Sequence, residues 1–178
     1  FIISRDFLKK IVFEAASRNQ SSFTREILQG KKDEYKIMGY EHKGIFTRID
    51  SVQSYYNANQ MLLETEKRNA LFVKNMPIYT KIGDNGPVKY GLDSSIKNSL
   101  IADGCVIEGT VENSILFRGV KVGKGTVVKN CVLLQGTKVG SNCSISYVIT
   151  DKNVEVSNDK VLTGSETYPL YIGKEGKI

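Results

Sequence analysis

A stretch of about seventeen residues is written twice in succession in this chain of 178 residues. The segment "VENSILFRGVKVGKGTV" spans residues 111–127, and "VKNCVLLQGTKVGSNCS" spans residues 128–144. An earlier copy begins at Ile96 and a degraded later copy at Ile145, so successive copies are offset by 15, 17 and 17 residues. Repetition at so short a period indicates a solenoid, in which each copy stacks on its neighbours because it cannot bury its apolar face alone.

Aliphatic residues recur about every six positions within each copy. A coil of three short strands, one for each face of a triangular prism, would direct these side chains to the axis. The sequence therefore predicts a left-handed parallel β-helix of hexapeptide repeats, with an exposed end strand suited to subunit assembly. The corners require small residues or positive φ, and they are assigned to Gly119, Gly123, Gly136 and Gly140. The predicted core residues are Leu116, Val122, Val128, Leu133, Val139 and Ile145, and the candidates for a hydrogen-bonded side-chain ladder are Asn113 and Asn130.

The first half of the chain follows a helical period instead. Apolar residues predict one helix from Asp6, a second short helix from Ser22, and a third over residues 52–63 that is capped by Asp50 or Ser51. The segments "FIIS", "YKIMGY" and "GIFT" read as strands. Because the chain opens within one of these, we expect a fragment of a larger mixed α and β sheet. The polar stretch at residues 77–87 separates this half from the repeats.

Composition excludes several classes of function. The 25 basic and 19 acidic residues are interspersed, so the net charge of +6 forms no basic stripe of the kind that binds nucleic acid. The three cysteines show no metal-ligand spacing, and His42 is the only histidine. No apolar run approaches the roughly 20 residues that a membrane span needs. We expect a cytoplasmic protein with reduced thiols and no membrane or nucleic-acid partner.

The junction between the halves carries a family resemblance. The segments "SYYNAN", "PIYT" and "IKNSLIADGCVI", in this order, resemble the carboxyl-terminal portion of bacterial ADP-glucose pyrophosphorylase, also called glucose-1-phosphate adenylyltransferase. The similarity extends over nearly the whole chain. It implies that residues 1–75 are the truncated carboxyl-terminal part of a nucleotidyltransferase (Rossmann-like) domain. Residues 76–178 would then be a linker and the β-helix domain.

Arg48 departs from the catalytic members of that family. Their corresponding segment reads approximately Tyr-Trp-Arg-Asp-Val-Gly-Thr, and its aspartate helps to hold Mg²⁺. With the register fixed by Tyr55, Ala58 and Asn59, Arg48 takes the aspartate position. Arginine offers only hydrogen-bond donors and a positive charge, so it cannot ligate Mg²⁺. Asp50, two residues along, fits the N-cap of the third helix better than a shifted metal ligand. We therefore expect no metal, cofactor or catalytic residue in this chain.

The resemblance then points to the non-catalytic, GlgD-type paralogue in the family. It implies a regulatory subunit for glycogen biosynthesis that has the catalytic subunit as its partner and forms a homo- or hetero-oligomer through the β-helix. Two alternatives remain: a competent adenylyltransferase subunit seen in part, and a hexapeptide-repeat acyltransferase. The acyltransferase is disfavoured, because such enzymes generally use a histidine base on the prism, and no histidine follows His42. The chain also lacks the glycine-rich loop that cradles nucleotide phosphates, so alone it should not make ADP-glucose.

Positive charges near the junction suggest a regulatory site. Members of the family respond to sugar phosphates and other anions that bind between their two domains. The candidate effector-binding residues here are Arg48, Lys74, Lys81 and Lys89. Ordinary surface solvation is the alternative interpretation of the three lysines.

Overall fold

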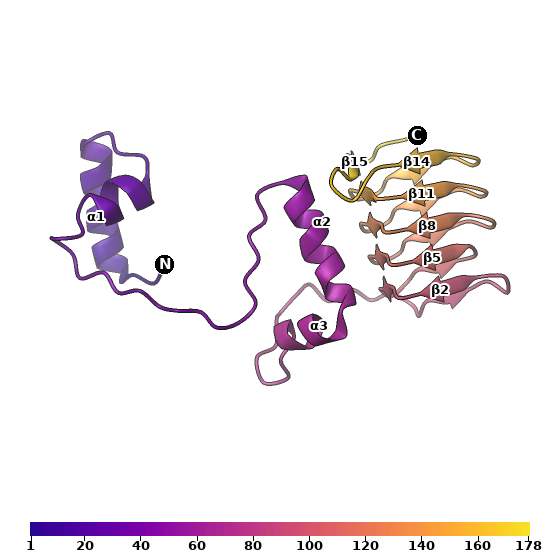
Figure 1. Ribbon diagram of the computed structural model, residues 1–178, viewed down its shortest axis with the longest axis horizontal. Coiled ribbons are helices and arrows are strands. Elements are labelled where there is room, and N and C mark those ends of the chain that lie inside the picture. The colour runs from indigo at the N-terminus through magenta and orange to yellow at the C-terminus, as the bar shows by residue number, and fades with distance from the viewer. The chain divides into compact units, whose positions relative to one another are not determined.

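The computed structural model describes residues 1–178 and contains two compact units, residues 1–43 and 44–178. The first unit is helical, and the second combines a β-helix with a short helical segment (Figure 1).

Two short helices make up the first unit. Helix α1 spans Arg5–Ser17, and η1, a π-helix, spans Phe23–Gln29. Ile11 and Ala15 lie four residues apart on α1 and pack against Ile27 of η1, forming a small core. The Ser22 side chain accepts a hydrogen bond from the backbone N–H of Arg25, so Ser22 is a functional N-cap for η1. The two helices predicted from Asp6 and Ser22 are thus present.

The three strands predicted in the first half are absent. Residues 1–4, 35–40 and 44–47 form no strand, so that prediction was wrong. An extended segment becomes a strand only when a neighbour pairs with its backbone, and an isolated pair of strands is marginal in water. No such ladder forms here, and Ile2, Met38 and Phe46 remain exposed.

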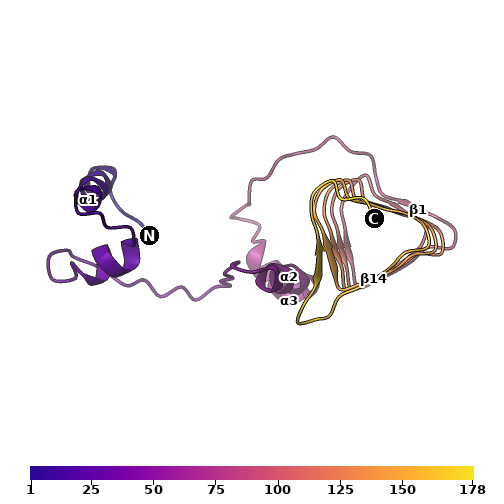
Figure 2. The ribbon, with the colours of Figure 1, turned by 90° about the horizontal axis from the view of Figure 1, so that it is seen from above.

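The second unit is dominated by a parallel β-helix, which Figure 2 shows end-on as a triangular prism. Its strands contain two or three residues each and form three parallel sheets of five strands. Sheet A is ordered β1-β4-β7-β10-β13, sheet B β14-β11-β8-β5-β2, and sheet C β15-β12-β9-β6-β3. The strands are β1 (Lys89–Tyr90), β2 (Ser95–Lys97), β3 (Leu100–Ile101), β4 (Val106–Ile107), β5 (Thr110–Glu112), β6 (Ile115–Leu116), β7 (Lys121–Val122), β8 (Val127–Lys129), β9 (Val132–Leu133), β10 (Lys138–Val139), β11 (Ser144–Ser146), β12 (Val148–Thr150), β13 (Glu155–Val156), β14 (Val161–Thr163) and β15 (Leu170–Ile172).

Strand register confirms the repeat read from the sequence. In sheet B, Ile96 pairs with Val111, Val111 with Val128, and Val128 with Ile145. These pairs reproduce the offsets of 15, 17 and 17 residues. A parallel β-helix of hexapeptide repeats is therefore the fold of this unit. The six aliphatic residues named above all lie in its buried core: Leu116, Val122, Val128, Leu133, Val139 and Ile145.

The corners use asparagine and glycine for backbone reasons. Asn98, Asn113 and Asn130 occupy one corner in successive coils, with φ of 44°, 46° and 52°. Asparagine tolerates this left-handed conformation better than most residues. The Asn98 side-chain amide donates to the side-chain oxygen of Asn113 at 2.8 Å. The ladder therefore joins Asn98 to Asn113. The sequence had suggested a ladder between Asn113 and Asn130, and their side chains do not form this hydrogen bond. Gly119 and Gly136 adopt the same conformation at another corner, with φ of 69° and 73°.

A helical segment packs beside sheet C. Helix α2 spans Val52–Gln60, the 3₁₀ turn η2 Met61–Leu63, and α3 Thr65–Leu71. Figure 2 shows α2 beside one face of the prism. Tyr56 of α2 is 4% exposed and packs on Val132 of β9 and Ile149 of β12. The compact unit that contains the β-helix consequently begins at residue 44, whereas the sequence suggested a boundary at residue 75.

Candidate functional site

Arg48 and Asp50 lie just before helix α2 and pair with each other. The Arg48 Nε atom is 3.2 Å from Asp50 Oδ2, and the two side chains are 78% and 56% exposed. Exposed pairs of this kind contribute little to stability. The pair bears more on metal binding than on stability, because the Arg48 guanidinium presents hydrogen-bond donors where a metal site needs oxygen ligands. No group of three or more His, Cys, Asp or Glu side chains in the chain is arranged to hold a metal ion.

Ser51, and not Asp50, caps helix α2. The Ser51 side chain accepts from the backbone N–H of Ser54, while Ser54 Oγ accepts from the backbone N–H groups of Ser51 and Asp50 at 2.9 Å. This reciprocal pair is a capping box built from two serines. Of the two N-caps that the sequence offered, Ser51 is confirmed and Asp50 was wrong. The physical reason is that Asp50 precedes the cap position and its carboxylate turns to Arg48.

The structure places Arg48 and Lys89, two of the four proposed effector-binding residues, near opposite ends of the β-helix. Arg48 precedes α2, whose Gln53 side chain donates to the Glu166 carbonyl near the last coil at 2.8 Å. Lys89 begins β1, at the opposite edge of sheet A from β13. Four strand spacings of about 4.8 Å separate those edges by about 19 Å. Lys74 and Lys81 lie on the exposed segment between α3 and β1. The structure therefore does not gather Arg48 and Lys89 into one pocket.

Tyr56 joins the helical segment to the β-helix by both a hydrogen bond and ring packing. Its hydroxyl donates to the Asn130 carbonyl at 2.9 Å, and its ring packs on Val132 and Ile149. Burial raises the pKa of Tyr56 well above its ordinary value, so the hydroxyl remains a donor at any physiological pH. The sequence predicted the helix that carries Tyr56 but not the partners of this side chain.

A second polar contact fastens the linker to the first complete coil. Asn85 Nδ2 donates to Asp103 Oδ2 at 2.9 Å, and Arg118 Nε lies 3.5 Å from the other oxygen of Asp103. The hydrogen bond from Asn85 is the largest cause of the lowered pKa of Asp103. Burial acts in the opposite direction, and the positive charge of Arg118 lowers the pKa further. The backbone N–H of Gly104 also donates to the Gly86 carbonyl at 2.7 Å. Together these contacts begin the first coil, and the term "linker clasp" refers below to Asn85, Gly86, Asp103 and Gly104.

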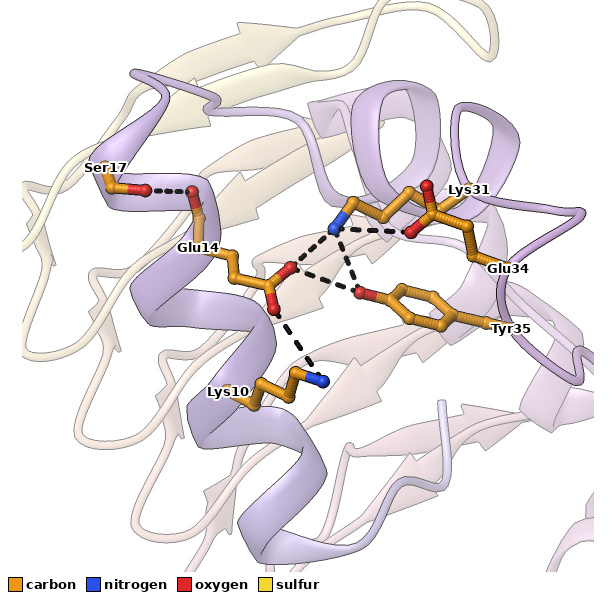
Figure 3. A network of polar contacts seen from close by, with 6 residues as sticks. All are labelled: Lys10, Glu14, Ser17, Lys31, Glu34 and Tyr35. Atoms are coloured by element: carbon orange, nitrogen blue, oxygen red, sulfur yellow. Dashed lines mark hydrogen bonds and ion pairs between the residues drawn. The ribbon is translucent and has the colours of Figure 1, made fainter.

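A network of polar contacts lies in the first unit (Figure 3). Lys31 Nζ donates to Glu14 Oε2 at 2.6 Å and to the Tyr35 hydroxyl at 3.0 Å, and Lys10 approaches the other Glu14 oxygen at 3.9 Å. The Lys31–Glu14 hydrogen bond lowers the pKa of Glu14 and raises the pKa of Lys31. Both groups are thus held charged, which suits a structural tie between α1 and the chain after η1 better than proton transfer.

The three cysteines are structural. Cys105, Cys131 and Cys143 are buried, and each thiol lies within hydrogen-bond distance of a backbone carbonyl. Burial raises the pKa of Cys131 to about 12 and raises the pKa of Cys105 as well. Protonated, inaccessible thiols are poor nucleophiles. Cys105 and Cys131 are therefore not activated nucleophiles, and Cys143 is buried as well.

Comparison with known proteins gives these features a family. Residues 88–167 match the family model described as "GlmU-like, C-terminal hexapeptide". The glycogen biosynthesis protein GlgD of Bacillus subtilis is 41% identical over 98% of this chain and 50% of its own length. The chain is a homologue of the GlgD proteins. GlgD of Geobacillus stearothermophilus is 42% identical over 52% of the chain and 34% of its own length.

More distant relatives of this GlgD homologue carry an enzyme name. Glucose-1-phosphate adenylyltransferase of Fusobacterium nucleatum is 33% identical over 72% of the chain and 34% of its own length. The chain thus spans at most about half the length of the curated relatives that it matches. None of its helices has the length and apolar character that crossing a membrane requires.

Proposed function

We propose that this GlgD homologue belongs to a non-catalytic regulatory subunit of ADP-glucose pyrophosphorylase in bacterial glycogen biosynthesis. In this proposal it joins the catalytic subunit in a cytoplasmic hetero-oligomer, and the β-helix supplies surfaces for assembly. The first coil supports such a role, because Ile96 is 38% exposed while its stacked counterpart Val111 is fully buried. An end coil of this kind leaves apolar side chains and strand edges to pair.

The observation that carries the proposal is Arg48. At the position where the family resemblance implies a magnesium-binding aspartate, the chain has a guanidinium engaged with Asp50. Asp50, two residues along the chain, is the candidate for a shifted ligand, and its carboxylate is engaged in that ion pair. A cation placed there would meet the positive charge of Arg48, which opposes metal binding.

We further infer that residues 1–75 derive from a nucleotidyltransferase-like domain. The first unit supports this inference because its core is small and its surface is unusually apolar. A hollow of about 800 Å³ is lined by Phe7, Ile11, Phe23, Leu28 and other apolar side chains. A unit of this size rarely folds without further chain to cover such a surface.

The test uses the full-length protein and the glucose-1-phosphate adenylyltransferase of the same cell. We expect the mixture to form a species of higher mass than either protein, measured by light scattering, and to form ADP-glucose faster than the enzyme alone. We expect no turnover by the GlgD homologue with ATP, Mg²⁺ and glucose 1-phosphate. Turnover by the protein alone that disappears in the Asp50→Asn variant would overturn the proposal, since Asp50 would then be a working ligand.

A catalytically competent adenylyltransferase subunit is the second candidate. It is favoured by the 33% identity to named adenylyltransferases over 72% of the chain. The same assay separates the two functions, because a competent subunit would turn over without a partner. Its activity would also be insensitive to addition of the second protein at saturating substrate.

A further inference from the structure

We propose that Asn85 is a site of spontaneous deamidation and that its modification opens the linker clasp. Asn85 is followed by Gly86, and this is the single Asn-Gly pair in the sequence. The pair is exposed and lies outside every helix and strand. It nevertheless fastens the chain to the β-helix, so a chemical change there has a structural consequence.

The reaction needs only water. The backbone nitrogen of Gly86 attacks the side-chain carbon Cγ of Asn85, a new C–N bond closes a five-membered succinimide, and the Cγ–Nδ2 bond breaks. Nδ2 leaves as ammonia and takes up the proton lost from the Gly86 nitrogen. Water then adds to one of the two imide carbonyls, which yields aspartate or isoaspartate. No oxidant, reductant or other reactant is required.

Local geometry leaves the attacking atom available. The Gly86 N–H donates no hydrogen bond, whereas the Gly86 carbonyl accepts from Gly104. The position that a Gly86 Cβ would occupy has no neighbouring atom within 4 Å. A side chain after the asparagine is the usual steric obstacle to ring closure, and here neither a side chain nor a neighbour supplies one.

The product would oppose the contact that Asn85 now makes. Asn85 Nδ2 donates to Asp103 Oδ2 at 2.9 Å, and replacing the amide with a carboxylate removes the donor and places like charges together. An isoaspartate would also add a methylene to the backbone beside the Gly86 carbonyl, which accepts from Gly104. Because the first coil is stacked on one side only, loss of the clasp should loosen that coil and leave the later coils folded.

Peptide mass spectrometry of the 178-residue chain, incubated in mildly alkaline buffer, tests the chemistry. We expect Asn85 to gain the mass difference between NH₂ and OH severalfold faster than Asn98. Asn98 is a matched internal control, since it is exposed and its amide is hydrogen-bonded, but it precedes Ser99. The Gly86→Ala variant, which the open space accommodates, should slow the reaction severalfold. Equal rates at Asn85 and Asn98, or no slowing in Gly86→Ala, would overturn the assignment of the site.

Hydrogen exchange tests the structural consequence. In the Asn85→Asp variant we expect faster exchange at the Gly104 amide, which donates across the clasp, and no change at the Val127 amide, which donates to Cys143 in the middle of the prism. The Asn85→Gln variant cannot close the five-membered ring and serves as the chemically inert control. Unchanged exchange at Gly104 in Asn85→Asp would show that the modification does not open the clasp.

Discussion

At the residue scale, stacked coils approach each other closely at glycine positions, where no Cβ separates the two backbones. A Cβ added to Gly123 would lie 2.7 Å from the backbone carbon and oxygen of Gly140, one coil away. Those atoms are backbone and cannot swing aside as the end of a flexible side chain can. The sequence identified Gly123 as a corner residue. It could not reveal that the requirement here is close approach, which differs from the positive φ at Gly119.

The first prediction at this scale concerns Gly123→Ala. We expect the added methyl group to push two coils apart and to lower the free energy of unfolding by about 1–3 kcal/mol, the usual cost of overpacking. Chemical denaturation followed by circular dichroism measures this loss. Gly173→Ala is the matched control, because its Cβ would meet nothing within 4 Å, and it should change stability little. Equal stability of the two variants would contradict the close-approach argument.

At the element scale, sheet C differs from sheet A because a helix covers it. Strands β7 and β10 of sheet A read Lys-Val, with the lysine exposed and the valine in the core. Strands β6 and β9 of sheet C read Ile-Leu and Val-Leu, and both residues of each are buried. The outward-facing Val132 of β9 and Ile149 of β12 are the residues on which Tyr56 packs. Apolar residues on both faces of one sheet are what a covered strand requires.

Tyr56 provides the prediction for this scale. Tyr56→Phe should lower the free energy of unfolding by about 1–3 kcal/mol, because the Asn130 carbonyl loses its donor. Tyr56→Ala should cost about 3–5 kcal/mol through the cavity that it leaves. It should also speed hydrogen exchange in α2 more than in sheet B. Tyr79→Ala, at a 91% exposed position, is the control and should be neutral. Unchanged exchange in α2 for Tyr56→Ala would show that this contact does not hold the helix.

The same elements show how far the sequence could be interpreted. The period of six predicted the core residues and strand register because every coil repeats the same environment. Adjacent aliphatic residues such as Ile115 and Leu116 were a signal that this sheet is buried on both faces. The same pattern is equally consistent with a short apolar run that has no covering helix. The strands expected at residues 35–40 and 44–47 failed for another reason, since strand pairing depends on a partner that local composition does not supply. The sequence could not show which candidate site residues lie together, because whether Lys89 lies near Arg48 depends on the path of the whole chain.

At the scale of the whole molecule, the boundary between units has an energetic meaning. Residues 44–75 contact the β-helix through Tyr56 and through Gln53, whose side chain donates to the Glu166 carbonyl. These contacts group residues 44–75 with the β-helix, although the family resemblance implies that they derive from the preceding domain. Truncation at two places distinguishes these views, because one cut preserves the cover of sheet C and the other removes it.

We expect a chain of residues 44–178 to be monomeric and cooperatively folded, since it keeps the β-helix core and its helical cover. A chain of residues 76–178 exposes Val132 and Ile149, which are at most 1% exposed in the intact unit. Exposed apolar surface of this kind promotes association, so the shorter chain should self-associate in sedimentation velocity and bind a hydrophobic dye more strongly. Replacing both residues with threonine in residues 76–178 should restore a monomer, because threonine suits a solvent-exposed strand face. If the unmodified shorter chain were already monomeric and as stable as residues 44–178, the helical segment would be an appendage, and the boundary would lie at residue 75 after all.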